Sequence, residues 1–143
     1  MNRVVLDASV VLKWYLVDEE YGHHALNLLD HYISNKWEFL APSLLEYEVI
    51  NGLILAQKRG RLKEEILRSA IEGFVQLDIK LANLSYFYPR VLYYCKLYSC
   101  SPYDASYLGL AETEGVALIT GDKKLYNMVE KNISWVKWIG NIE

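Results

Sequence analysis

The sequence contains only two cysteines, Cys95 and Cys100, among its 143 residues. Two cysteines cannot form the disulfide framework of a small secreted domain, and they lack the second ligand pair of a structural zinc site. The sequence also shows no internal repeat, low-complexity tract or linker. These absences exclude disulfide-rich and fibrous proteins, and they predict one domain spanning residues 1–143.

A long uncharged hydrophobic run is missing as well, although residues 4–17 are largely apolar. Asp7 and Lys13 interrupt this segment, and no small-residue cleavage site follows it, so it does not resemble a signal peptide. No uncharged segment approaches the roughly 18 residues of a membrane-spanning helix. We therefore expect a cytoplasmic protein that does not associate with membranes.

The chain has no excess of positive charge. It contains 15 Lys and Arg residues and 18 Asp and Glu residues, which gives a formal net charge of -3. Proteins that bind nucleic acids usually carry an excess of positive charge. This charge balance suits nucleic-acid chemistry only if acidic residues gather at a cation-filled site while Lys and Arg line its rim.

Short β-branched runs alternate with longer segments of helical periodicity along the whole chain. This pattern predicts an α/β fold with a mostly parallel central sheet of about five strands, flanked by helices on both faces. Ser43 and Glu46 form a possible capping box, and Pro89 is expected to kink or to start its helix. Strands are expected at 3–6, 37–41, 77–81, 116–120 and 135–138, and helices at 8–16, 20–34, 43–58, 62–75, 84–98, 101–114 and 123–131.

Four acidic residues fall where ligands bind in an open parallel sheet, beyond the carboxyl ends of the strands. Asp7 and Asp122 follow two predicted strands, Asp104 lies in the first turn of a helix, and Glu48 borders the apolar face of another helix. Carboxylates gathered in one pocket repel one another and must protonate or bind cations. Because Mg²⁺ and Mn²⁺ prefer oxygen ligands, the pattern predicts a metal site suited to phosphodiester hydrolysis.

Most of these carboxylates also have an ordinary structural interpretation. Asp7 and Asp122 could be helix N-caps, and Asp104 could belong to a capping box with Ser101. Glu48 is harder to explain in this way, because a carboxylate beside an apolar face needs a partner. The residues alone leave both interpretations open.

Four motifs, taken together and in order, resemble the PIN domain. They are residues 6–10 with Lys13 and Trp14 downstream, residues 42–51, residues 102–112 and residues 119–125. The resemblance spans nearly the whole chain and is nearest to free-standing VapC-like toxins. It implies a Mg²⁺- or Mn²⁺-dependent endoribonuclease whose catalytic and metal-binding residues are Asp7, Glu48, Asp104 and Asp122.

The resemblance also implies supporting residues and partners. Ser9 and Thr120 would hydrogen-bond metal-bound water or the substrate phosphate, and Asn51 would support Glu48. Ser9 could instead cap a helix, and Asn51 could be an ordinary exposed residue. Gly121 departs from the commoner Thr-Ala-Asp pattern and is expected to add backbone freedom beside Asp122. The implied partners are RNA, a second copy of the chain, and a small VapB-like antitoxin whose C-terminal segment enters the acidic cleft, often with an Arg.

Lys13, Lys96 and Lys123 are the candidate phosphate contacts at the rim of the cleft. The basic run at 58–63 is more typical of a helix C-cap. Aromatic clusters at 86–88 and 93–94 place more apolar surface on one helix than a monomer readily hides, which predicts a homodimer interface. Of the remaining aromatic residues, most are expected in the core or at an interface, and the three histidines are expected to be structural or exposed.

Other classes of protein fit the pattern less well. A catalytically silent PIN-like scaffold would lack part of the acidic set, and here all four positions are filled. A response-receiver domain needs an acidic pair after its first strand and an Asp after a middle strand, where this chain has Asp7 alone and the pair Leu81 and Ala82. A Rossmann module needs a glycine-rich first turn. The nuclease accounts for all four carboxylates, with the silent scaffold as the alternative.

Overall fold

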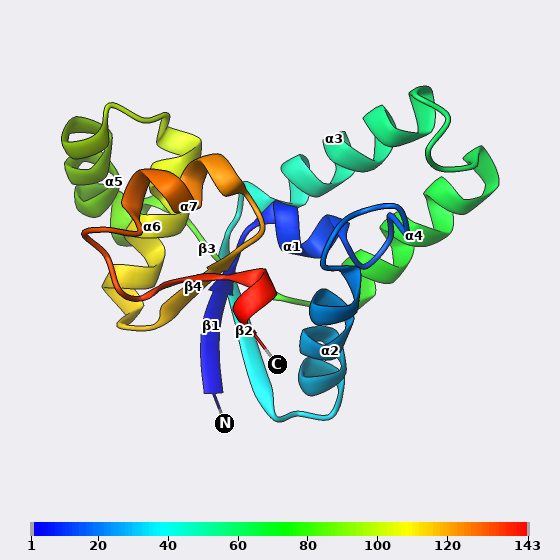
Figure 1. Ribbon diagram of the computed structural model, residues 1–143, viewed down its shortest axis with the longest axis horizontal. Helices are drawn as coiled ribbons and strands as arrows, with labels where there is room; N and C mark the ends of the chain where they lie inside the picture. The colour runs from blue at the N-terminus through cyan, green and yellow to red at the C-terminus, as the bar shows by residue number, and fades with distance from the viewer. Residues whose placement is uncertain (1, 143) are drawn as a thin grey trace.

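Five short strands form one parallel sheet in the computed structural model, which describes residues 2–142 (Figure 1). Their order across the sheet is β3-β2-β1-β4-β5, and every neighbouring pair runs parallel. The predicted sheet is confirmed. The strands are β1 (Asn2–Leu6), β2 (Trp37–Pro42), β3 (Lys80–Ala82), β4 (Ala117–Thr120) and β5 (Val136–Trp138).

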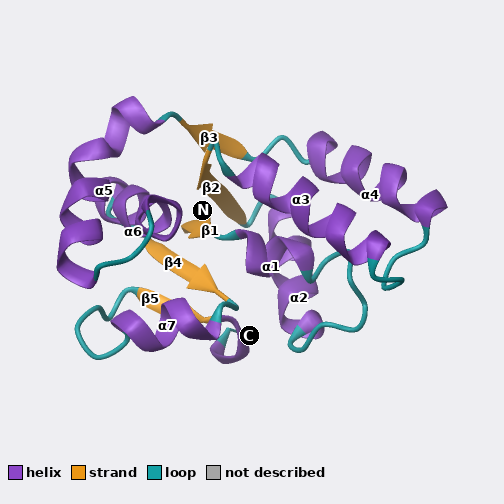
Figure 2. Ribbon diagram, turned by 90° about the horizontal axis from the view of Figure 1, so that it is seen from above, coloured by secondary structure: helices purple, strands orange, loops and turns teal. Residues whose placement is uncertain are grey.

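Helices cover both faces of this sheet (Figure 2). α5 and α6 pack against each other on one face, and α1 and α2 lie on the other. α3 and α4 form a helical hairpin that projects beyond the sheet on the side of α1, and α7 packs on β4 and β5. The helices are α1 (Ala8–Leu12), α2 (Gly22–Ile33), α3 (Leu45–Lys58), α4 (Glu64–Gln76), α5 (Leu84–Tyr98), α6 (Pro102–Glu114), α7 (Lys123–Val129) and the 3₁₀ turn η1 (Ile139–Asn141).

The central strands are apolar without alternation because helices bury both of their faces. Val5 in β1 and Leu118 in β4 are fully buried. Helix α6 is buried on all sides between residues 105 and 111, since α5 covers the face that the sheet does not. A Cβ at Gly109 would lie 3.1 Å from the backbone nitrogen of Val91, so the glycine allows α6 to approach α5 closely. This packing holds the first turn of α6 at the edge of the sheet.

The predicted capping box at Ser43 and Glu46 is wrong. Helix α3 begins at Leu45, and its N-cap, Leu44, makes no side-chain cap hydrogen bond. Ser43 is instead drawn into the sheet, because its N–H donates a hydrogen bond of 2.9 Å to the carbonyl of Ala82. Tertiary pairing of β2 with β3 has displaced the local capping signal.

Several predicted element ends also moved. Helix α1 ends at Leu12 rather than at residue 16, and β3 begins at Lys80 rather than at residue 77. Helix α5 begins at Leu84 and continues through Pro89, so the proline does not start it. None of the helices between residues 2 and 142 is long and apolar enough to cross a membrane.

The basic run at 58–63 behaves as a helix end. Helix α3 stops at Lys58, and Gly60 follows with a φ of +75°, a conformation that favours glycine. Arg61 is turned back toward the loop after α1, where its guanidinium pairs with Asp18 at 2.8 Å and with Glu19 at 2.7 Å. The C-cap interpretation is therefore the one that the structure supports.

Candidate active site

The strand order reverses between β1 and β4, which lie side by side although the chain visits β2 and β3 between them. Such a reversal leaves a crevice beyond the carboxyl ends of the two strands, and ligands of open α/β sheets bind there. Asp7 directly follows β1, and Asp122 lies two residues beyond the end of β4. The tertiary topology thus places the first and last predicted carboxylates at the same crevice.

Asp7 is held by hydroxyl groups from two different strand ends. Its side chain is only 5% exposed, and the hydroxyls of Ser9 and Thr120 each donate a hydrogen bond to one of its carboxylate oxygens. Burial raises the pKa of Asp7 to about 6, the two hydroxyls oppose this shift, and the charge of Asp122 adds to it. A buried carboxylate with a raised pKa is a common feature of functional sites.

The same two hydroxyls also accept hydrogen bonds from the loop after β4. The N–H of Gly121 donates to Ser9 Oγ at 2.8 Å, and the N–H of Asp122 donates to Thr120 Oγ1 at 3.0 Å. Asp7 itself makes no side-chain cap hydrogen bond to α1. Ser9 and Thr120 therefore position Asp7 and tie the two loops together, and neither the cap interpretation of Asp7 nor that of Ser9 describes these contacts.

Glu48 receives a partner from a helix on the other side of the crevice. The phenol of Tyr107 on α6 donates a hydrogen bond of 2.5 Å to Glu48 Oε1. Burial raises the pKa of Glu48, the Tyr107 hydrogen bond opposes the shift, and the charges of Asp104 and Asp122 add to it. Our sequence analysis missed Tyr107, although it lies three residues after Asp104 and hence on the same helix face.

Asp104 and Asp122 each lie at the start of a helix as well as at the crevice. Ser101 caps α6 by accepting the N–H of Asp104 at 3.2 Å, and Asp122 caps α7 by accepting the N–H of Leu125 at 3.2 Å. Burial and the charge of Asp122 raise the pKa of Asp104, whereas Lys124 lowers it. The capping interpretation is correct for Asp122, and the cap engages one of its two oxygens.

The four carboxylates form one electrostatic group, in which Asp122 acts on each of the other three. Between residues 2 and 142, no Lys, Arg or His forms an ion pair with any of them. An all-oxygen set with uncompensated negative charge suits a hard cation such as Mg²⁺. Within the same residues no three Asp, Glu, His or Cys side chains converge as a ready-made cage. This openness fits Mg²⁺, which typically takes one or two carboxylates and keeps several waters.

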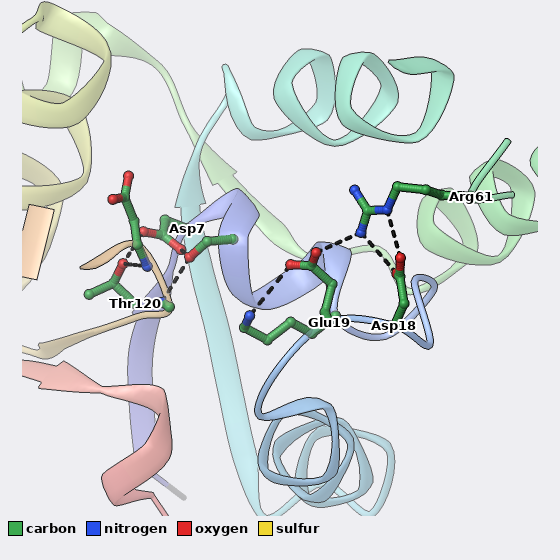
Figure 3. A network of polar contacts seen from close by, with 9 residues as sticks. Asp7, Asp18, Glu19, Arg61 and Thr120 are labelled. Carbon is green, nitrogen blue, oxygen red and sulfur yellow. Dashed lines mark hydrogen bonds and ion pairs between the residues drawn. The ribbon is translucent and has the colours of Figure 1, made fainter. Parts of the chain in front are cut away.

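Lys13 is buried beside Gly121 in the loop after β4. The residue is only 7% exposed, and its Nζ lies 3.5 Å from Glu19 Oε1. Figure 3 shows Glu19 turned toward Arg61, which pairs with it from the loop after α3. A Cβ at Gly121 would lie 2.7 Å from Lys13 Cε. The glycine has no positive φ, so its role here is to make room for Lys13 rather than to supply backbone freedom.

The remaining candidate residues lie on the surface. Lys96 and Lys123 are exposed, and neither makes an ion pair within residues 2–142. Lys124, the neighbour of Lys123, is the lysine whose charge reaches Asp104. Asn51 is exposed and lies one helical turn from Glu48 on α3. Their roles remain predictions.

Fold and crevice together define a parallel α/β protein with an acidic site at its topological switch point. A sequence profile of the PIN domain matches residues 4–131 of the chain. The match covers well over half of the sequence, and the chain belongs to the PIN-domain family.

Individual relatives agree with this assignment. Ribonuclease VapC3 of Pyrobaculum aerophilum is 28% identical over 125 residues, which is 86% of this chain and 92% of the relative. The crystal structure of PAE2754 from the same organism covers 97% of this chain and 85% of its own, with a TM-score of 0.67 and 21% identity. The DNA-bound VapBC of Salmonella typhimurium matches with a TM-score of 0.61 and 17% identity, over 96% of this chain and 97% of that one. The structural matches show a shared fold.

Proposed function

We propose that this protein is a metal-dependent endoribonuclease and the toxin of a VapBC-like toxin-antitoxin pair, acting in the cytoplasm as one PIN domain over residues 1–143. The observation that carries the proposal is the electrostatic coupling of Asp7, Glu48 and Asp104 to Asp122. These four carboxylates come from four separate segments and form no ion pair within residues 2–142. The sequence relative named Ribonuclease VapC3 supports the choice of RNA as substrate.

The four carboxylates would hold Mg²⁺ or Mn²⁺ through their oxygens. A bound divalent cation polarises a phosphodiester and activates water at neutral pH. Ser9 and Thr120 orient both oxygens of Asp7, while Tyr107 orients Glu48 and occupies one of its oxygens. Lys124 on the rim, together with the predicted contact Lys123, would attract the phosphate backbone of RNA toward an otherwise acidic cleft.

Two partners belong to the proposal. The Salmonella typhimurium structure is that of a DNA-bound VapBC, which supports a VapB-like antitoxin as partner of this chain. Of the two aromatic clusters predicted to form a homodimer interface, Tyr86, Tyr88 and Tyr93 on α5 are exposed and support the prediction, whereas Phe87 and Tyr94 are buried in the core. Sedimentation should therefore give the mass of a dimer, and co-expression with an antitoxin should yield a complex that does not cleave RNA.

The deciding experiment is cleavage of a mixed single-stranded RNA by purified protein, free of antitoxin, with Mg²⁺, with Mn²⁺ and with EDTA. Asp7→Asn and Asp104→Asn should each abolish cleavage, and EDTA should do the same. Asp30→Asn, which alters an exposed carboxylate on α2, is the matched control and should cleave like wild type. A folded wild-type protein that cuts no RNA with either metal would replace this proposal by the silent scaffold.

A further inference from the structure

A groove runs beside the acidic crevice, between helix α3 and the first turn of α6. It has a volume of about 400 Å³ and shares Glu48 with the crevice. Its α3 wall has helical spacing, so that these side chains form one continuous face. The lining residues are Leu44, Tyr47, Glu48 and Asn51 on the α3 side and Tyr103 on α6.

Tyr47 and Tyr103 are the most exposed tyrosines among the described residues. Tyr47 is 77% exposed and Tyr103 is 64% exposed, and neither hydroxyl hydrogen-bonds to another group within residues 2–142. Both rings therefore add little to the stability of the fold. Aromatic side chains that lie in water and line a groove beside a reactive centre are typical of surfaces on which bases of single-stranded nucleic acid stack.

The polar groups of this groove suit a neutral heterocycle better than a phosphate. It contains the carboxylate of Glu48 and no Lys or Arg, so an anion would be repelled. The Asn51 amide is exposed and offers both a donor and an acceptor, the pair needed to bind the edge of a base. Because Tyr103 directly precedes Asp104, a base in the groove would lie next to a phosphate in the acidic crevice.

We propose that Tyr47 and Tyr103 form a stacking subsite for one unpaired nucleobase adjacent to the scissile phosphate, with Asn51 contacting the edge of that base. The inference rests on the proposed ribonuclease function and extends it to the substrate, which is then single-stranded RNA with a base preference next to the cleaved bond. Our sequence analysis placed most tyrosines in the core or at an interface, and these two differ from that expectation.

Binding without cleavage tests the subsite directly. In an Asp7→Asn background, a short single-stranded RNA carries the fluorescent adenine analogue 2-aminopurine next to the mapped cleavage position. Stacking on tyrosine should quench this fluorescence. Tyr47→Ala and Tyr103→Ala should each weaken RNA binding roughly 5- to 100-fold and relieve the quenching. The corresponding phenylalanine variants should stay within about 2-fold of the parent, because they keep the ring.

Tyr86→Ala is the matched control, since Tyr86 is an exposed tyrosine on α5 that does not line the groove. It should bind RNA like the parent. Asn51→Ala should reduce the preference among four oligonucleotides that differ only at the neighbouring base. Circular dichroism of each variant establishes that the loss does not come from unfolding.

Several outcomes would overturn the subsite. Alanine variants that bind RNA like the parent would do so, as would phenylalanine variants that lose as much affinity as the alanine variants. Unchanged RNA binding together with loss of a co-expressed antitoxin would assign the groove to a protein partner instead. These results are separable from the ribonuclease proposal, because wild-type cleavage that persists with a failed subsite leaves that function intact. Conversely, RNA affinity lost in the alanine variants of a protein that cuts no RNA would leave an RNA-binding groove, but it would remove both the nuclease and the place of the subsite beside a scissile phosphate.

Discussion

Tyr107 on α6 donates a hydrogen bond of 2.5 Å to Glu48 on α3, and it thereby joins two helices across the crevice. The phenol is only 3% exposed and lies beside Asp104 on the same helix face. The buried helix α6 therefore carries Asp104 and, through Tyr107, also orients Glu48. Tyr107 is thus a positioning residue for the proposed metal site.

Removing the hydroxyl of Tyr107 should weaken metal binding without unfolding the protein. Tyr107→Phe keeps the buried ring, so we expect a drop in cleavage of about 10- to 100-fold, the usual cost of losing a partner of a metal-binding carboxylate. A Mg²⁺ titration of the cleavage rate should show a higher half-saturating concentration. Tyr98→Phe, on the half-buried face of α5, is the control and should leave the titration unchanged. An unchanged Mg²⁺ dependence in Tyr107→Phe would contradict the positioning role.

Asp7 should make the metal-free protein less stable as pH rises. Its pKa is about 6 in the folded state against 3.8 for the free side chain, so the folded state holds the proton more tightly. The contribution of Asp7 to the free energy of unfolding is fully present below pH 3.8, and it is lost as pH rises through about 6. The loss is about 3 kcal/mol, because one pKa unit corresponds to about 1.4 kcal/mol and burying the charged form is unfavourable.

Thermal unfolding in EDTA as a function of pH checks this prediction. Asp7→Asn should unfold at a higher temperature than wild type at about pH 7 and should lose the decline between about pH 4 and pH 6. Mg²⁺ should restore stability to wild type and not to the variant. Asp30→Asn, whose carboxylate is exposed, should follow the wild-type curve. Parallel pH curves for wild type and Asp7→Asn would refute the argument.

Gly121 and Lys13 should be energetically coupled. A methyl group at residue 121 would meet Lys13 Cε at 2.7 Å and would push the ammonium away from Glu19. Gly121→Ala should therefore lower the free energy of unfolding by about 1 kcal/mol in the wild-type background. The same substitution should cost less in a Lys13→Ala background, where the contact with Ile139 Cγ2 at 3.3 Å remains but the one with Lys13 is gone. Urea unfolding of the four proteins of this double-mutant cycle measures the coupling, and simple additivity would show that the two side chains do not compete.

Ser101 should stabilise the helix that carries Asp104. Ser101→Ala removes the acceptor of the Asp104 N–H and should cost about 1 kcal/mol of unfolding free energy, whereas Ser101→Asn should keep most of it. Ser69→Ala is the control, because Ser69 is exposed in the interior of helix α4 and caps nothing. Urea denaturation compares the three variants. Equal losses in the alanine and asparagine variants at residue 101 would mean that the cap hydrogen bond is not the cause.

Local patterns in the sequence were sufficient for the class of fold. The β-branched runs ending at Leu6 and Thr120 predict strands that helices bury on both sides, and the structure contains both strands. The Ser101 cap was also predictable, because its acceptor and the N–H that it binds are three residues apart. Ser43 and Glu46 have the same three-residue spacing, but the backbone N–H of Ser43 hydrogen-bonds to the carbonyl of Ala82 instead of starting a helix. Local signals fail where a distant segment competes for the same group.

The sequence by itself determined which residue types were available for chemistry, namely the four carboxylates at predicted strand ends and helix starts. Only the tertiary structure decided that β4 lies against β1, so that Thr120 meets Asp7 and the charge of Asp122 reaches it. It alone paired Tyr107 with Glu48 and buried Lys13 behind Gly121. The physical reason is that these contacts join residues far apart in the chain. They form only when packing of the whole core offsets the loss of conformational entropy that comes with bringing those segments together.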